Sequence, residues 1–179
     1  SLNCALKDIG ASADTLTQSQ LRIQLNVDGI PIFNSNNYTV WPILAKVVEP
    51  VQTAVFVIGV YGGTTKPKDF NIYFRMLVNE MKSINDEGGV FCSITESCLP
   101  VSILNICCDA AARGSERCVR AFNFRYGCDR CKVCGKHTDG RMTFLESDAE
   151  MRKDSDFKKP INKDDPAEYR TDHSILREL

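Results

Sequence analysis

Two aspartates are among the few residues of this sequence whose type and position point to chemistry. Asp28 and Asp109 each close an apolar, strand-like run, at the point where a strand would leave a sheet. Ligands and metals gather at strand ends in α/β sheets, so two carboxylates on neighbouring strands could bind divalent cations through hard oxygen atoms. The alternative is that Asp28 opens a turn with Gly29 and that Asp109 caps the following helix.

A cysteine cluster is the second candidate site. The stretch CDRCKVC supplies two overlapping Cys-x-x-Cys pairs, Cys128 with Cys131 and Cys131 with Cys134. Two thiolates at this spacing can hold one zinc ion if two further ligands come from elsewhere, and the sequence has only two histidines, His137 and His173. Four ligands at three-residue steps would wrap very tightly around one ion, which favours a single pair over a self-contained Cys3His site.

Two other interpretations of these thiols stay open. A redox pair is the first, although thioredoxin-like motifs follow an early strand and open a helix, whereas this one follows an arginine-rich loop. Thiols without a ligand, buried or on the surface, are the second.

Composition places the chain among ordinary globular proteins, with 179 residues, 43% apolar and 25% charged. Nine cysteines are an odd number in a chain of this size, which favours reduced thiols in an intracellular protein over a secreted disulfide scaffold. No run approaches the length of a membrane span, and the first residues lack the pattern of a secretory signal. The first residue is not Met, as expected for a fragment of a longer chain.

Positive charge is concentrated around the cysteines. Residues 111–141 hold eight Lys and Arg against three Asp and Glu, whereas the segments before and after each hold seven against ten. Such a patch is where a phosphate backbone could dock, and a solvated basic loop is the alternative. The candidate phosphate contacts are Arg113, Arg117, Arg120, Arg125, Arg130, Lys132 and Lys136, with Phe122, Phe124 and Tyr126 among them.

Hydrophobic periodicity predicts the order β-β-β-α-β-α. Apolar and polar residues alternate from Leu21, which predicts a half-buried strand, and two more β-rich runs suggest an antiparallel meander. After a possible N-cap at Asp69, an apolar stripe with helical spacing runs from Phe70 to Met81. The other predicted elements are strands at 38–48 and 53–61, a buried central strand at 101–108 and a helix after Asp109.

Three stretches taken in order resemble a known family, the transposase-domain proteins of animals that derive from cut-and-paste DNA transposons of the CACTA, Mirage and Chapaev group. The wider set includes the recombinase that cuts antigen-receptor genes. The resemblance covers roughly residues 20–150. It is carried by LNVDGIPIFNSNNYTVWPILAKV, FVIGVYGGTTKPKDFNIYFRMLVNEM and NICCDAAARGSERCVRAFNFRYGCDRC.

The resemblance implies an α/β fold with an incomplete RNase H-like core and a small zinc-binding insertion. Asp28 matches the first acid of an Asp, Asp, Glu triad and Asp109 the second, so both are expected catalytic residues that hold Mg or Mn. Cys128 and Cys131 match the family's zinc pair, whereas Cys134 lies outside its pattern. The implied division is an N-terminal extension (1–20), a partial core (21–127), the start of the Cys-rich insertion (128–145) and a polar acidic tail (146–179) with surface segments or partial disorder.

The family completes its triad with a late glutamate and its zinc site with a downstream histidine pair, and neither is identified in this chain. The implied function is a fragment or domesticated descendant of a DNA transposase whose parent cleaves phosphodiesters and transfers strands with two Mg²⁺ ions. The alternative is a non-catalytic DNA- or protein-binding module. The resemblance also implies DNA as the partner of the parent protein, a homo-oligomer, no membrane association and a nuclear location.

Overall fold

The computed structural model describes residues 20–32, 37–146 and 148–179. Nearly all of the extension predicted for residues 1–20 lies outside the described residues. The chain forms two compact units, which are described separately below. Unit 1 runs to Cys108 and includes Leu179, and unit 2 is Asp109–Glu178. The division between the two units falls after residue 108.

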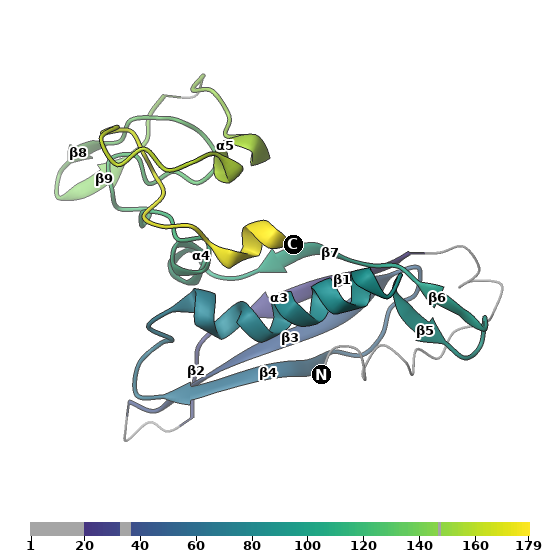
Figure 1. The fold of residues 1–179 in the computed structure, drawn as a ribbon. Helices are drawn as coiled ribbons and strands as arrows, with labels where there is room; N and C mark the ends of the chain where they lie inside the picture. The colour runs from purple at the N-terminus through teal and green to yellow at the C-terminus, as the bar shows by residue number, and fades with distance from the viewer. Residues whose placement is uncertain (1–19, 33–36, 147) are drawn as a thin grey trace. The chain divides into compact units, whose positions relative to one another are not determined.

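Unit 1 is built on a five-stranded mixed sheet (Figure 1). The first three long strands are consecutive antiparallel neighbours, which confirms the predicted meander, and the last strand pairs in parallel with the first. A two-residue strand adds to the start of the second long strand. The strands are β1 (Leu21–Val27), β2 (Ile30–Pro31), β3 (Thr39–Glu49), β4 (Phe56–Gly63) and β7 (Val101–Cys107), in the order β2-β3-β1-β7 with β4 on β3.

Helix α3 (Phe70–Asp86) follows the sheet's third long strand and lies across one face of the sheet (Figure 1). The Asp69 carboxylate accepts hydrogen bonds from two backbone N–H groups of the first turn, which confirms the predicted N-cap. The helix buries one stripe of side chains, and β1 buries alternate residues. The buried residues are Phe70, Phe74, Leu77, Val78, Met81 and Ile84 of α3 and Leu21, Ile23, Leu25 and Val27 of β1.

Strand β7 is not the buried central strand that its apolar composition predicted. It pairs only with β1, and its other edge has no partner strand among the described residues. Leu104 is 47% exposed and lies at an irregularity in the pairing with β1, between Ile103 and Asn105. A short hairpin, β5 (Val90–Cys92) with β6 (Ser97–Leu99), precedes β7 and was not predicted.

Unit 2 has little regular secondary structure. It contains the short helix α4 (Ala110–Glu116) where a helix was predicted, the hairpin β8 (Lys136–Thr138) with β9 (Arg141–Thr143), the helix α5 (Asp154–Lys158) and the 3-10 turn η1 (Ile175–Glu178).

The described part of the acidic tail is mostly exposed, in agreement with the predicted surface segments, and it also contacts the rest of unit 2. Backbone bridges join Val119 to Arg170 and Cys131 to Met151. Tyr169 and Ile175 are each 5% exposed. Polar contacts hold most of this segment in place.

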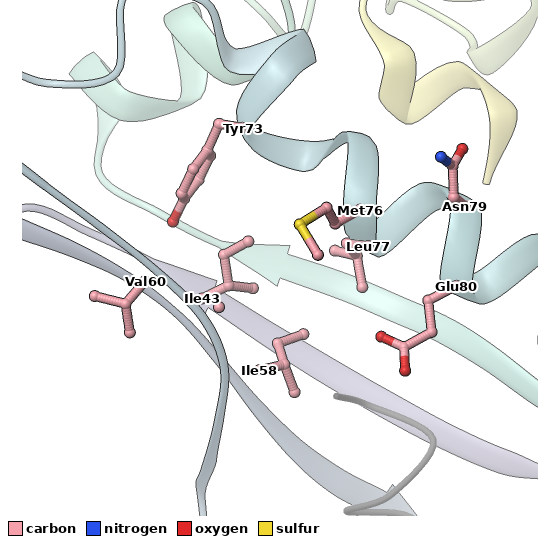
Figure 2. A pocket seen from close by; sticks show the side chains of 9 residues that line it. Ile43, Ile58, Val60, Tyr73, Met76, Leu77, Asn79 and Glu80 are labelled. Carbon is pink, nitrogen blue, oxygen red and sulfur yellow. The ribbon is translucent and has the colours of Figure 1, made fainter.

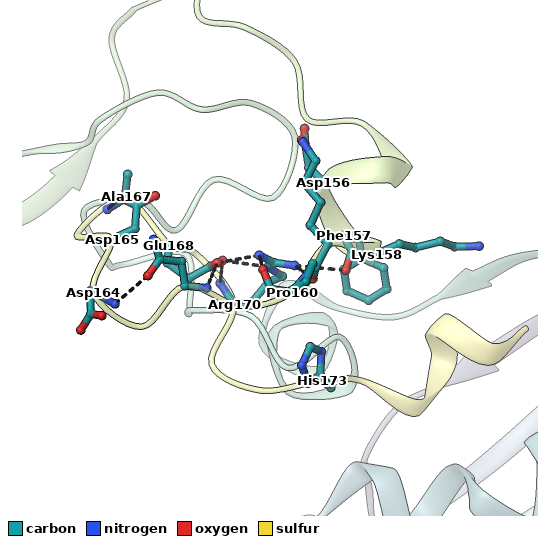
Figure 3. Close-up of polar contacts among 12 residues, drawn as sticks. Asp156, Phe157, Lys158, Pro160, Asp164, Asp165, Ala167, Glu168, Arg170 and His173 are labelled. Carbon is teal, nitrogen blue, oxygen red and sulfur yellow. Dashed lines mark hydrogen bonds and ion pairs between the residues drawn. The ribbon is translucent and has the colours of Figure 1, made fainter.

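An ion pair in the tail organises these contacts (Figure 3). Arg170 donates to both carboxylate oxygens of Glu168 at 2.8 and 2.6 Å, and the two side chains are only 7% and 8% exposed. The same guanidinium donates to the carbonyl oxygens of Lys159 and Pro160 at 2.5 and 3.1 Å. Arg170 thus joins the segment at Lys159 and Pro160 to the segment at Glu168.

Among the described residues, no helix is long and apolar enough to cross a membrane.

Candidate functional site

The two aspartates follow strands that end at the same edge of the sheet. Strands β1 and β7 are adjacent and parallel, and their last paired residues are Asn26 and Cys107. Asp28 comes directly after β1, and Asp109 comes two residues after β7. Both aspartates are exposed.

Close packing positions the chain at Asp28. The Asp28 Oδ1 atom accepts a 2.7 Å hydrogen bond from the backbone N–H of Gly29. A Cβ atom on Gly29 would lie 2.6 Å from the indole ring of Trp41, so only glycine fits against that ring. The Trp41 ring in turn meets the Phe70 ring edge-on, with centroids 5.9 Å apart, at the start of α3.

Asp109 is the N-cap of α4 in unit 2. Its Oδ1 atom accepts a 2.6 Å hydrogen bond from the backbone N–H of Ala112. Asp109 therefore fills the local role that the sequence offered as its alternative, a helix cap. Asp28 does not open the turn offered as its alternative, because β1 and β2 pair with β3 in one continuous register and the chain runs on through Asp28. In each aspartate the backbone N–H binds Oδ1. The other carboxylate oxygen, Oδ2, could bind a hard cation.

Two polar side chains beside this edge were missed by the sequence interpretation. Gln24 Nε2 donates to the Cys107 sulfur at 2.8 Å, and Asn26 Nδ2 donates to the Cys107 carbonyl oxygen at 3.3 Å. These contacts tie the last residue of β7 to β1. The alternating pattern identified both residues only as the polar face of a strand, and the fold was needed to show the partner.

A groove of about 550 Å³ lies in unit 1 between the edge strand β4 and helix α3 (Figure 2). Its lining is mainly apolar and contains neither aspartate, so the groove is separate from the candidate metal ligands. The lining residues are Ile43, Ile58, Gly59, Val60, Tyr73, Met76, Leu77, Asn79 and Glu80.

The cysteine pair of unit 2 has the geometry of two ligands to one zinc ion. The Cys128 and Cys131 sulfur atoms lie 3.4 Å apart. Two sulfurs that are each bound to a tetrahedral zinc would lie about 3.8 Å apart, so the pair fits two of four positions. The Arg152 Nε donates to the Cys128 carbonyl oxygen at 2.9 Å, and the Arg152 guanidinium stacks 3.7 Å from the Tyr169 ring centroid.

The surroundings favour a thiolate at Cys128. Burial raises the pKa of this thiol, but hydrogen bonds from the backbone at Cys131 and Arg130 outweigh burial and lower the pKa below its usual value. At Cys131 a backbone hydrogen bond from Val133 acts to lower the pKa, but burial and the Cys128 sulfur outweigh it and raise the pKa. Of the two thiols, Cys128 therefore loses its proton first.

Cys134 makes a different set of contacts. Its sulfur accepts a 3.1 Å hydrogen bond from Arg125 Nε, and this bond, aided by Tyr126, lowers the pKa of the Cys134 thiol. Among the described residues, no three or more His, Cys, Asp or Glu side chains are grouped so as to hold a metal ion. The structure therefore does not bring Cys134, His137 or His173 to the Cys128 pair.

Several of the predicted phosphate contacts are already engaged within unit 2. Arg113 and Arg117 both pair with Asp129, at 3.0 and 3.7 Å. Lys132 pairs with Glu150 at 2.8 Å, and Arg120 Nε donates to the Glu168 carbonyl oxygen at 2.8 Å. Within the described residues, no ion pair involves the side chain of Arg125, Arg130 or Lys136.

Comparison with protein-family models, with curated proteins and with solved structures finds no match to this chain.

Proposed function

We propose that this chain is a fragment or domesticated descendant of a cut-and-paste DNA transposase, with Asp28 and Asp109 as the remaining acids of its catalytic site. The parallel pairing of β1 with β7 carries the proposal, because an RNase H-like core requires the strands before its first two acids to be neighbours. The antiparallel order β1, β3, β4 followed by helix α3 also agrees with such a core.

The two carboxylates fit a divalent cation chemically. Magnesium and manganese favour oxygen ligands, and each aspartate contributes an exposed carboxylate after a strand that ends at this edge. In a transposase such ions activate water or a DNA 3′-hydroxyl group for attack on a phosphodiester. In this chain Asp28 and Asp109 would hold the cation, while packing of Gly29 on Trp41 and the α4 cap would keep the two acids in place.

A second function is favoured by the local roles of the same aspartates. Each Oδ1 is engaged by a backbone N–H, and no grouping of three ligands occurs in the part of the chain that the structure describes. A non-catalytic DNA- or protein-binding module descended from a transposase would keep these two contacts for folding alone.

Cleavage of a fluorescent duplex in Mg²⁺ and in Mn²⁺ separates the two functions. Two carboxylates supply fewer ligands than an acidic triad, so we expect cutting by this chain to be absent or very slow, and any Mn²⁺-dependent nicking to be lost in Asp28→Asn and in Asp109→Asn. Asp86→Asn, an exposed acid at the end of α3, is the matched control and should have no effect.

Two outcomes would count against the proposal. Robust cutting that Asp28→Ala abolishes would show that the site is complete and not a remnant. Nicking that survives both Asp→Asn changes would show that the two aspartates are not the metal ligands and would leave the binding module as the better function.

A further inference from the structure

Two exposed phenylalanines of unit 2 lie in one short loop. Phe122 is 59% exposed and Phe124 is 50% exposed, and the other residues of the loop at 121–125 are exposed as well. We call residues 121–125 the Phe loop. Two large apolar rings that are half-exposed within three residues are a feature of binding surfaces more than of a folded core. The Arg120 guanidinium lies over the Phe124 ring, 5.9 Å from its centroid.

The Phe loop is held in a defined shape. Phe124 N–H donates to the Ala121 carbonyl oxygen at 2.9 Å, and Gly127 N–H donates to the Phe124 carbonyl oxygen at 2.9 Å. A Cβ atom on Gly127 would lie 2.1 Å from the Ala121 carbonyl oxygen, so the chain can close this tightly only at glycine. The Arg120 N–H anchors the base of the loop by a 2.6 Å bond to the Tyr169 carbonyl oxygen.

Cationic side chains lie next to the Phe loop. The Gly135 N–H donates to the Arg125 carbonyl oxygen at 2.6 Å, which joins the loop to the β8–β9 hairpin. That hairpin carries exposed Lys136 and Arg141, and within the described residues neither has an ion-pair partner. Arg125 is exposed too, and its bond to the Cys134 sulfur engages only one of its five N–H donors.

The charge of this region favours a polyanion over an apolar partner. Residues 120–143 contain six Lys and Arg against two Asp and Glu. One of the two acids, Asp129, is already paired with arginines of unit 2. The surface therefore combines stacking rings with a net positive charge, which is the combination that binds single-stranded nucleic acid.

We propose that the Phe loop and the β8–β9 hairpin together bind single-stranded DNA. Phe122 and Phe124 stack on unpaired bases, while Arg125, Lys136 and Arg141 contact phosphates. The rings make the surface selective for unpaired strands, because bases within a duplex are already stacked on one another. The choice of DNA as the nucleic acid rests on the proposed function.

The test compares a labelled oligothymidine with a duplex by fluorescence anisotropy, in buffer without Mg²⁺ or Mn²⁺. The double change Phe122→Ala, Phe124→Ala should weaken single-strand binding about tenfold or more and leave duplex binding nearly unchanged. Phe91→Ala is the control, because Phe91 lies in β5 of unit 1 and is similarly exposed, at 54%. Circular dichroism verifies that each variant is folded.

A salt series tests the cations. If Lys136 and Arg141 each contact a phosphate, Lys136→Ala and Arg141→Ala should each reduce the slope of log K against log salt by about 0.7. Single-strand affinity that is unchanged by the double Phe change, or an equal loss for single strand and duplex, would overturn the proposal. A change of oligomeric state in sedimentation without loss of DNA binding would assign the rings to a protein contact and would overturn it too.

The two proposals fail separately. Asp28→Asn should leave metal-free binding of oligothymidine intact, because Asp28 is not part of this surface. If the Phe variants bind normally while Mn²⁺-dependent nicking still needs the aspartates, only the single-strand surface is refuted. If the aspartates have no effect while the Phe variants lose single-strand binding, only the transposase site is refuted.

Discussion

The two units of this chain are stabilised in different ways. Unit 1 has long strands and the helix α3, whose buried faces are apolar, with Phe74 and Ile23 fully enclosed. Unit 2 has short elements, and its order depends on arginines that bind carboxylates, carbonyl oxygens and an aromatic ring, chiefly Arg152 and Arg170. A polar segment with little regular secondary structure can therefore pack well when its arginines bind groups within the same unit.

The largest effect is expected in the apolar core of unit 1. Phe74→Ala should lower the free energy of unfolding by about 3–5 kcal/mol, because it removes a ring that is 0% exposed. Denaturant unfolding followed by fluorescence of Trp41, the single tryptophan, reports on this unit. Ile72→Ala, 70% exposed on the same helix, is the control and should change stability little. Equal losses for both variants would show that α3 is not packed as described.

The buried ion pair should be nearly as important to unit 2. Arg170→Met leaves the Glu168 carboxylate buried without its partner, which should cost about 3 kcal/mol. Hydrogen exchange of peptides from 109–178 measures this loss. Lys159→Met, which breaks an ion pair whose Lys159 side chain is 63% exposed, should cost less than about 1 kcal/mol. If Arg170→Met leaves exchange in unit 2 unchanged, the pair does not organise the tail.

Acid should loosen unit 2 before unit 1. Burial acts to raise the pKa of Glu168, but hydrogen bonds from Arg170 outweigh it and lower the pKa to about 2, from an ordinary value of 4.5. The unfolded chain therefore binds this proton more tightly. The stabilisation is complete above about pH 4.5 and decreases as pH falls toward 2, with about 2 kcal/mol lost near pH 3. Glu168→Gln should remove this dependence, and an unchanged acid transition would contradict the assignment.

Metal removal should produce a smaller effect that is also confined to unit 2. At a zinc concentration ten times its Kd, binding by the Cys128 and Cys131 thiolates would stabilise the unit by about 1.4 kcal/mol, and a chelator would remove this. Metal analysis should find zinc in the purified protein and in Cys134→Ser, and find none in Cys128→Ser, Cys131→Ser. Loss of zinc in Cys134→Ser alone would show that a different pair binds the metal.

The elements of unit 1 were largely predictable, because their apolar residues recur with the period of a strand or of a helix. Alternation in β1, the helical stripe after Asp69 and the apolar run of β7 each identified an element within a few residues. The position of β7 at the sheet edge was not predictable from those runs. An apolar strand has the same composition at the edge as in the centre, and only the pairing partners distinguish the two positions.

Unit 2 was predictable mainly at its helix and cysteines. A local spacing rule identifies Cys128 and Cys131 as a pair, because the two thiols are only three residues apart. No spacing rule predicts the contact of Arg170 with the Lys159 carbonyl oxygen or that of Arg152 with the Cys128 carbonyl oxygen. Side chains that bind backbone carbonyl groups accept any residue type as partner, so the sequence carries no pattern that reveals them.

The proposal that Asp28 and Asp109 hold one divalent cation can be tested by Mn²⁺ titration followed by NMR. Bound Mn²⁺ broadens nearby amide signals, so Gly29 and Ala112 should broaden together, Asp28→Asn or Asp109→Asn should remove both effects, and Asp86→Asn should remove neither. Broadening that is confined to one of the two amides, or that persists in both Asp→Asn variants, would refute a shared metal site and would leave the non-catalytic binding module as the better function.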